Sequence, residues 1–400
     1  MLSWEDTPSV SAMRCSRAWV EISLEAIQHN VREFCQLLRP ATELMAVVKA
    51  DAYGHGAIAV ARTALAAGAT WLGVATVPEG IELRQAGVAA PILVMGALNH
   101  AEEIRAVARW QLQPTIVSPQ QALVFAEALS EVCLPLPVHI QLDTGMSRLG
   151  ADWQRALEFV EFVAGLPALQ ITGLYSHFAT ADETDNTEMY RQHERFERAI
   201  ATLKTHHRLP PRLHLANTAA TLSNAGAFQY NMVRVGLGIY GVSPAPHLRS
   251  VISLKPALAV KARITHIKQI PAGAGVSYGH RFIAKQPMTI AIVGIGYADG
   301  VPRVLSDRLS VVIGNQLVPQ IGAITMDQLM LDVSNIHPLH EGDVVTLLGG
   351  SPPHQITADD WANRIGTISW EVLCSFKHRL PRITTRNSAR KLCPAEDSLL

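Results

Sequence analysis

The feature that most constrains the fold is a regular alternation from Glu43 to about Gly236. Short β-branched runs alternate there with longer segments whose apolar residues recur at helical spacing, a pattern typical of βα units around a parallel sheet. Eight runs have the character of buried strands: 45–48, 71–75, 92–95, 113–117, 138–142, 170–174, 212–215 and 232–235. Eight such units favour an α/β fold with a (β/α)8 TIM-type barrel, and a Rossmann-like open sheet is the alternative.

The pattern changes after about Ser253 to alternating, β-rich runs separated by Gly and Pro, with helical spacing only near ADDWANRIG and ISWEVLCSF. We therefore expect a flexible extension over 1–16, a barrel domain over 17–252 and a mainly β domain over 253–400. The early run AWVEISLEAI predicts a strand followed by a helix from about Leu24, and this strand can pair with the C-terminal domain. Met13 is an alternative initiator to Met1.

Composition narrows the possible functions. The chain has 34 Lys plus Arg and 34 Asp plus Glu, so it lacks the basic excess of a nucleic-acid-binding protein and a small-molecule partner is expected. No apolar run approaches the roughly 20 residues of a membrane span. An odd number of scattered cysteines without a CxxC pair indicates a reducing compartment, the cytoplasm, and argues against structural zinc: Cys15, Cys35, Cys133, Cys374 and Cys393.

One segment departs from this neutral balance. Between Arg198 and Ala298 there is no Asp or Glu, although the segment contains twelve Lys and Arg residues. Either an anionic group binds near it or acidic residues from elsewhere in the fold compensate the charge, and both interpretations stay open here.

Lys49, in AVVKADAYGHG, is expected at the C-terminal end of the first barrel strand, where barrel enzymes place their chemistry. A partly desolvated lysine loses its proton more readily and can form a Schiff base with a carbonyl, above all with pyridoxal 5'-phosphate (PLP). A snorkelling or ion-paired lysine is the plainer interpretation. Tyr53, in a Gly-flanked turn, can reach a phosphate.

A glycine pattern follows the eighth strand, with Gly236, Gly238 and Gly241 spaced as G-x-G-x-x-G. Dinucleotide binding also needs an acidic residue about 20 positions further on, and the acid-free segment has none. The pattern therefore favours a phosphate-binding loop, to which the Thr218 hydroxyl can contribute. Taken alone, Thr218 is more typical of a helix N-cap.

Nine segments in order resemble the motifs of the alanine racemase family: AVVKADAYGHG, LDTGMSRLG, SHFATAD, HLANTAAT, VRVGLGIYG, VSYGHR, GYADGVPR, ITMDQLMLDV and EVLC. The resemblance runs from about Arg17 to Arg382. It implies a PLP-bearing barrel, a C-terminal β domain, and a homodimer whose active sites take residues from both subunits.

The resemblance also assigns the cofactor site. It implies that Lys49 carries PLP, that His177 lies beside the pyridine ring, and that Arg234 faces the pyridine nitrogen. An arginine cannot give up its proton, so it would keep that nitrogen an unprotonated acceptor and weaken the electron sink. The residues implied to hold the phosphate are Tyr53, Asn217, Thr218, Gly236 and Leu237.

For the substrate, the resemblance implies that Arg148 and the Met326 N–H, with Asp327 beside it, bind the carboxylate. Tyr278 would come from the partner subunit to the face of Cα opposite Lys49, which gives racemisation its two acid–base groups. An ordinary phenol has a pKa of about 10, so cations such as His177 and Arg234 would have to assist it.

The sequence departs from the family at two positions. Gln141 stands where many members have a carbamylated lysine that braces the arginine matching Arg148, so a neutral amide or a bound chloride would have to replace it. His378 replaces a common tyrosine or lysine and has no assigned role. The implied function is interconversion of L- and D-alanine, which supplies D-alanine for peptidoglycan. Racemisation of another small amino acid such as serine, and a non-catalytic PLP-binding role, are the alternatives.

Overall fold

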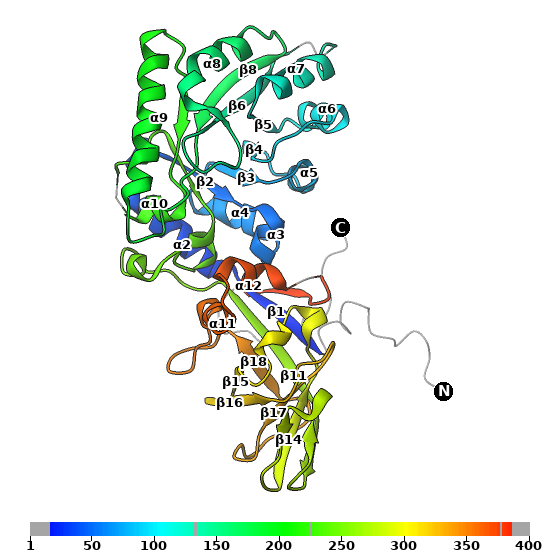
Figure 1. Cartoon of the computed structure of the whole chain (residues 1–400). Coiled ribbons are helices and arrows are strands. Elements are labelled where there is room, and N and C mark those ends of the chain that lie inside the picture. The colour runs from blue at the N-terminus through cyan, green and yellow to red at the C-terminus, as the bar shows by residue number, and fades with distance from the viewer. Residues whose placement is uncertain (1–16, 132–133, 224–225, 377, 386–400) are drawn as a thin grey trace. The chain divides into compact units, whose positions relative to one another are not determined.

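A computed structural model describes residues 17–131, 134–223, 226–376 and 378–385 (Figure 1). Its contacts divide the chain into two units, residues 26–255 and, in the second unit, residues up to Glu25 together with those from Pro256 onward. Each unit is described by itself below. The expected extension over 1–16 and the alternative start at Met13 lie outside the described residues.

The first unit is a closed barrel of eight parallel strands. Their order is β5-β4-β3-β2-β10-β9-β8-β6, and β5 also pairs with β6. This closure confirms the predicted barrel, and a Rossmann-like sheet is wrong because such a sheet leaves two edges open. A ninth, two-residue strand, β7 (Ala151–Asp152), extends β6 and was not predicted. The barrel strands are β2 (Glu43–Val47), β3 (Trp71–Val74), β4 (Ile92–Val94), β5 (Gln113–Ile116), β6 (Leu136–Asp143), β8 (Leu169–Tyr175), β9 (Arg212–His214) and β10 (Met232–Val235).

Helices follow the strands and lie outside the barrel (Figure 1). Their starts have local causes, such as Ser118, whose side chain accepts the Gln121 N–H at the first turn of α7. The helices of this unit are α2 (Leu24–Leu37), α3 (Lys49–Gly54), α4 (Ala57–Ala67), α5 (Val77–Gln85), α6 (Ala101–Arg109), α7 (Pro119–Ala128), α8 (Ala156–Ala164), α9 (Thr187–Thr205) and α10 (Thr218–Ser223).

The barrel interior is packed with large side chains. One buried cluster contains Met45, Trp71, Leu93, Tyr175 and Met232, each from a different strand. The interior is therefore a core and not a channel, so a ligand has to bind beyond the strand ends.

The second unit is a β domain, as predicted. Strand β11 (Leu258–Ile270) pairs with β18 and β1 through its first half and with β14 through its second, which closes a ring of six antiparallel strands. The early strand β1 (Ala18–Ser23) belongs to this sheet, between β11 and β19. The other elements are β12 (Gly275–Val276), β13 (Phe282–Ile283), β14 (Met288–Val293), β15 (Ser310–Ile313), β16 (Gln316–Ile321), β17 (Leu329–Asp332), β18 (Val344–Leu348), α11 (Ala358–Ile365), α12 (Ser369–Ser375) and β19 (Arg382–Thr385).

Among the described residues, no helix is both long and apolar enough to cross a membrane.

Candidate active site

Lys49 follows β2 after one intervening residue, Val48, close to the predicted strand end, and it opens an unusual turn. Residues 50–53 all adopt left-handed backbone angles, with φ between 51° and 55°. Left-handed helical geometry costs an L-residue roughly 1–2 kcal/mol, so four in succession mark a strained segment of the kind that accumulates at functional sites. No sequence pattern predicts this turn, because Ala50, Ala52 and Tyr53 are not residues that favour positive φ.

Hydrogen bonds hold this turn from both sides. The Ala50 N–H donates to Glu79 Oε1 at 2.7 Å, and the Ala57 N–H donates to Asp51 Oδ1 at 2.7 Å. The strand that leads into the turn is fixed by the Tyr240 hydroxyl, which donates to the Val47 carbonyl at 2.7 Å.

The expected phosphate-binding residues converge after β10. The Gly236 N–H donates to Thr218 Oγ1 at 3.0 Å, and a Cβ on Gly236 would lie 2.7 Å from the Tyr53 hydroxyl oxygen. Only glycine therefore leaves room beneath that hydroxyl. Leu237 begins the short 3-10 helix η3 (Leu237–Tyr240) immediately after Gly236.

Asn217, whose contact with the phosphate stays a prediction, acts at the start of α10. Its Oδ1 accepts the Ala220 N–H at 3.0 Å, so Asn217 caps α10. Thr218 is the first residue of that helix and its hydroxyl turns to Gly236. The interpretation of Thr218 as the N-cap is therefore wrong, because Asn217 occupies that place.

Arg234, on β10, lies in the barrel with 3% of its surface exposed. Its Nη2 donates to the Ser176 carbonyl at 2.8 Å and to His177 Nδ1 at 3.0 Å, and its Nη1 donates to His214 Nδ1 at 2.9 Å. Burial lowers the pKa of Arg234 to about 10, which leaves it charged at neutral pH. Among the described residues it forms no ion pair, and its Nε–H has no acceptor.

Two further buried histidines, His214 and His139, extend this network, and sequence reasoning missed both. His214 Nε2 and His139 Nδ1 are 2.8 Å apart. Because arginine can only donate, His214 accepts at Nδ1 and donates from Nε2 to His139. Burial lowers the pKa of His139 to about 3 and that of His214 well below its usual value, so both rings are neutral.

His177 is also neutral, which corrects the expectation that it acts as a cation. Burial lowers its pKa well below the usual value, and the charges of Arg234, Arg148 and Lys49 lower it further. Of these three cations, Arg234 contacts the ring directly, through its Nη2 at 3.0 Å from His177 Nδ1.

Arg148 lies on an exposed loop after β6. The Gln141 side-chain amide donates to the Leu149 carbonyl at 3.2 Å, so it braces the loop backbone next to Arg148. This contact favours the neutral-amide alternative, and a bound chloride stays a prediction.

In the second unit, Tyr278 presents its side chain to solvent, with 72% of its surface exposed. The backbone around Tyr278 is nevertheless held by close contacts. The Ser277 hydroxyl donates to the Ala323 carbonyl at 2.7 Å, and a Cβ on Gly275 would lie 2.2 Å from the His280 ring. The structure therefore offers an exposed phenol on a well-defined turn.

The Met326 turn is also fixed by backbone contacts. The Tyr297 N–H donates to the Thr325 carbonyl and the Ala298 N–H to the Met326 carbonyl, each at 3.0 Å. A Cβ on Gly296 would lie 2.2 Å from the Thr325 carbonyl oxygen, so only glycine fits beneath the turn. The Met326 N–H donates to no acceptor in the described parts of the chain and can serve a ligand.

Ion pairs also stabilise the Met326 turn. Asp299 is fully buried and accepts two hydrogen bonds from Arg17, at 2.7 and 2.8 Å. Arg379 contacts Asp299 at 3.5 Å and donates to Asp327 at 2.7 Å. His378, beside Arg379, is exposed, and the structure assigns it no role.

Acidic residues from outside the acid-free segment compensate part of its charge. Arg208 pairs with Glu161, Arg212 with Glu43, and Lys261 with Glu21. Arg234 is buried in the barrel and pairs with no acidic residue among those that the structure describes. In the described residues no group of three His, Cys, Asp or Glu side chains is arranged to hold a metal.

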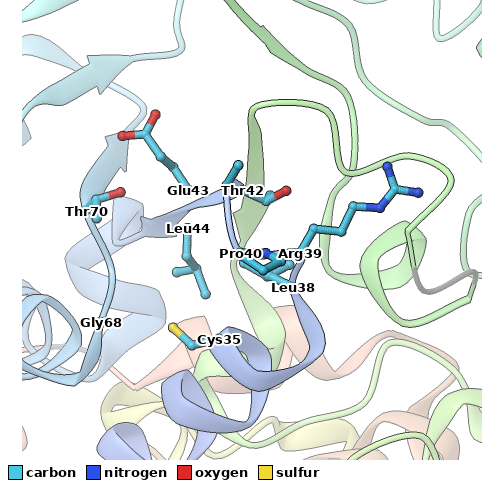
Figure 2. A pocket seen from close by; sticks show the side chains of 10 residues that line it. Cys35, Leu38, Arg39, Pro40, Thr42, Glu43, Leu44, Gly68 and Thr70 are labelled. Carbon is cyan, nitrogen blue, oxygen red and sulfur yellow. The ribbon is translucent and has the colours of Figure 1, made fainter.

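A surface pocket of about 320 Å³ lies at the opposite ends of β2 and β3 from Lys49 (Figure 2). It is lined by residues 38–44, Gly68, Thr70 and Cys35, whose thiol pKa is raised by burial. No expected site residue lines it, so we do not assign the chemistry to this pocket.

Comparisons with known proteins agree with this arrangement. The profile described as "Alanine racemase, N-terminal domain" matches residues 22–244, and "Alanine racemase, C-terminal domain" matches residues 257–384. The alanine racemase of Nostoc sp. is 62% identical over 92% of this chain and 95% of its own length, and that of Synechocystis sp. is 59% identical over 92% and 98%.

Solved structures show the same similarity. The alanine racemase of Streptomyces lavendulae has a TM-score of 0.88 at 34% identity, covering 96% of this chain and 98% of its own. That of Bacillus anthracis with bound L-Ala-P has a TM-score of 0.87 at 36% identity, covering 93% and 95%. The chain belongs to the alanine racemase family.

Proposed function

We propose that this protein interconverts L- and D-alanine with PLP held in the barrel. The observation that carries the proposal is the convergence of Lys49, Tyr53 and the Gly236 loop with a buried arginine that has no carboxylate partner. We also propose a cytoplasmic enzyme whose D-alanine is used for peptidoglycan.

The residues present fit this cofactor. Tyr53, Thr218 and the backbone at Gly236 and Leu237 form a small cradle of hydroxyl and N–H groups suited to a phosphate. Lys49 is the amine that would carry PLP, which when bound supplies an electron sink for the carbanion at Cα. The unused Nε–H of Arg234 is suited to a pyridine nitrogen, and it would keep that nitrogen an acceptor.

Racemisation requires a proton to leave one face of Cα and another to arrive at the opposite face. We assign the two transfers to the Lys49 amine and to the Tyr278 phenol of a second copy of the chain. The exposure of Tyr278 supports a homodimer, because other large apolar side chains of the same unit are exposed too: Tyr297 at 41% and Met326 at 52%. Backbone bonds hold Tyr297 against the Met326 turn.

The substrate carboxylate is assigned to Arg148 and to the Met326 N–H, with Asp327 beside it. A guanidinium fork and a backbone donor are both suited to a carboxylate. A methyl and a hydroxymethyl side chain differ by only about 1–3 kcal/mol in a pocket, so we expect serine to be a poorer substrate and not an excluded one.

The test is a circular dichroism assay of the PLP-loaded protein with each enantiomer of alanine and of serine. We expect both alanine enantiomers to converge on a racemic mixture, with kcat/KM about 10–100-fold higher than for serine. Lys49→Ala should abolish both reactions. Binding of PLP without any racemisation would instead show a carrier.

A further inference from the structure

The left-handed turn after Lys49 is a strained segment with function at both ends. Lys49 precedes it and Tyr53 is its last residue, so its shape sets where the amine and the phosphate-binding hydroxyl lie. Within the turn, the Ala52 N–H donates to the Val48 carbonyl at 2.9 Å. Four residues with a Cβ have to be kept at φ above 50° in this turn.

Glu79 supplies a contact at the start of this turn. Its Oε1 accepts the Ala50 N–H at 2.7 Å, while its Oε2 accepts the Ala75 N–H at 2.7 Å and the Thr76 N–H at 3.1 Å. One half-buried carboxylate thus accepts from the residue after Lys49 and from the end of the neighbouring strand β3. Three converging donors need an acceptor-only group, and an ionised carboxylate is that group.

Helix capping alone does not account for Glu79. Glu79 is the third residue of α5, and the bond from Thr76 is what an N-terminal cap requires. The corresponding residue of α11, Asp360, uses its carboxylate only within its own cap, on Thr357. In Glu79, by contrast, Oε1 accepts from Ala50 in the Lys49 turn, and Oε2 accepts from Ala75 at the end of β3 as well as from the cap.

We propose that Glu79 is a positioning residue that holds the left-handed turn, and through it Lys49 and Tyr53, in the shape that binds the cofactor. This inference rests on the proposed function, because it takes PLP as the ligand of Lys49 and Tyr53.

The experiment compares Glu79→Gln with two controls in the full-length apoenzyme. Glu82→Gln makes the same change on an exposed residue of the same helix, and Thr76→Ala alters the cap while leaving Glu79 in place. The measurements are the Kd for PLP, and amide hydrogen exchange of the 49–56 segment without cofactor. A glutamine keeps one acceptor oxygen but turns an NH2 group toward backbone donors.

We expect Glu79→Gln to weaken PLP binding at least 10-fold and to speed exchange of the turn, while both controls stay within about 2-fold of the wild type. Equal effects of Glu79→Gln and Thr76→Ala would reduce Glu79 to a helix cap and overturn the proposal. If the Gln variant is insoluble, Glu79→Asp takes its place, because the shorter side chain does not reach Ala50. We then expect Glu79→Asp to weaken PLP binding and to speed exchange more than either control does.

A rescue separates positioning from general stability. Glycine adopts positive φ without steric cost, and Ala50 is exposed, so Ala50→Gly relieves strain without opening a cavity. We expect it to restore PLP affinity at least 3-fold in the Glu79→Gln background, and no rescue would contradict the proposal. A wild-type protein that binds no PLP would instead refute the proposed function, whatever the variants do.

Discussion

The two units surround an arginine with opposite kinds of partner, neutral groups in the barrel and a carboxylate in the β domain. In the barrel, Arg234 is surrounded by carbonyl oxygens and neutral histidines, and burial lowers its pKa to about 10. In the β domain, Arg17 donates to the buried carboxylate of Asp299, and that hydrogen bond raises the pKa of Arg17.

This difference separates a functional charge from a structural one. Asp299 neutralises Arg17, and the pair fixes the turn that carries Met326. Neutral acceptors orient Arg234 without neutralising it, so its charge and its Nε–H stay available to a ligand. Neutral histidines suit this position because a carboxylate in their place would neutralise the Arg234 guanidinium.

The largest effect is expected when the cation among the neutral histidines, Arg234, is replaced by an acid. Arg234→Glu would put a carboxylate against His177 and His214 and would favour a protonated pyridine nitrogen, a stronger electron sink. We expect racemisation to fall at least 100-fold and long-wavelength absorbance of the bound cofactor to rise when alanine is added. An unchanged spectrum would remove this explanation of the role of Arg234.

Asp299→Asn tests the ion-paired arrangement. It leaves Arg17 and Arg379 without their shared anion, and the loss of one partner of a buried pair costs on the order of 3 kcal/mol. We expect lower thermal stability and a KM for alanine raised about 10-fold with a smaller change in kcat. A matched substitution at the partly exposed Asp343, Asp343→Asn, should leave KM unchanged. Loss of stability without any effect on KM would show that the network does not position the Met326 turn.

The pH dependence of stability tests the neutrality of the barrel histidines. The folded pKa of His139 is about 3, below the unfolded value near 6.5, so the unfolded chain binds more protons between those values. Stability should therefore fall as the pH drops below 6.5, by about 2 kcal/mol at pH 5 from His139 alone. Denaturant unfolding at pH 7 and pH 5 measures this, and His139→Gln should reduce the difference. An equal pH dependence in the variant would show that His139 titrates normally in the fold.

The smallest effect is expected at Gln141. Gln141→Ala removes the bond to the Leu149 carbonyl and should raise the KM for alanine by a factor of about 2–5, because the Arg148 loop loses one support. Replacing chloride by methanesulfonate in steady-state assays should change the KM for alanine of neither the wild type nor the Gln141→Ala variant. A chloride-dependent KM would instead favour the bound anion.

The sequence predicted the barrel well because buried parallel strands are continuous apolar runs with helices between them. It missed β7, since two residues carry no periodic signal. Motif matching proposed the site residues, but it did not predict the contacts between strands that hold them. The bond from His214 to His139 depends on which strands face each other inside the barrel, and the contact from Glu79 to Ala50 depends on strained backbone angles.

The most direct test of the account follows alanine in D2O. PLP-loaded protein is incubated with L-alanine, and circular dichroism and the loss of the α-proton signal are recorded together. Two acid–base groups predict that the optical signal decays while deuterium enters at Cα. Exchange with retained configuration would mean that a single base acts and that Tyr278 does not deliver a proton, and no exchange would contradict the proposed reaction on alanine.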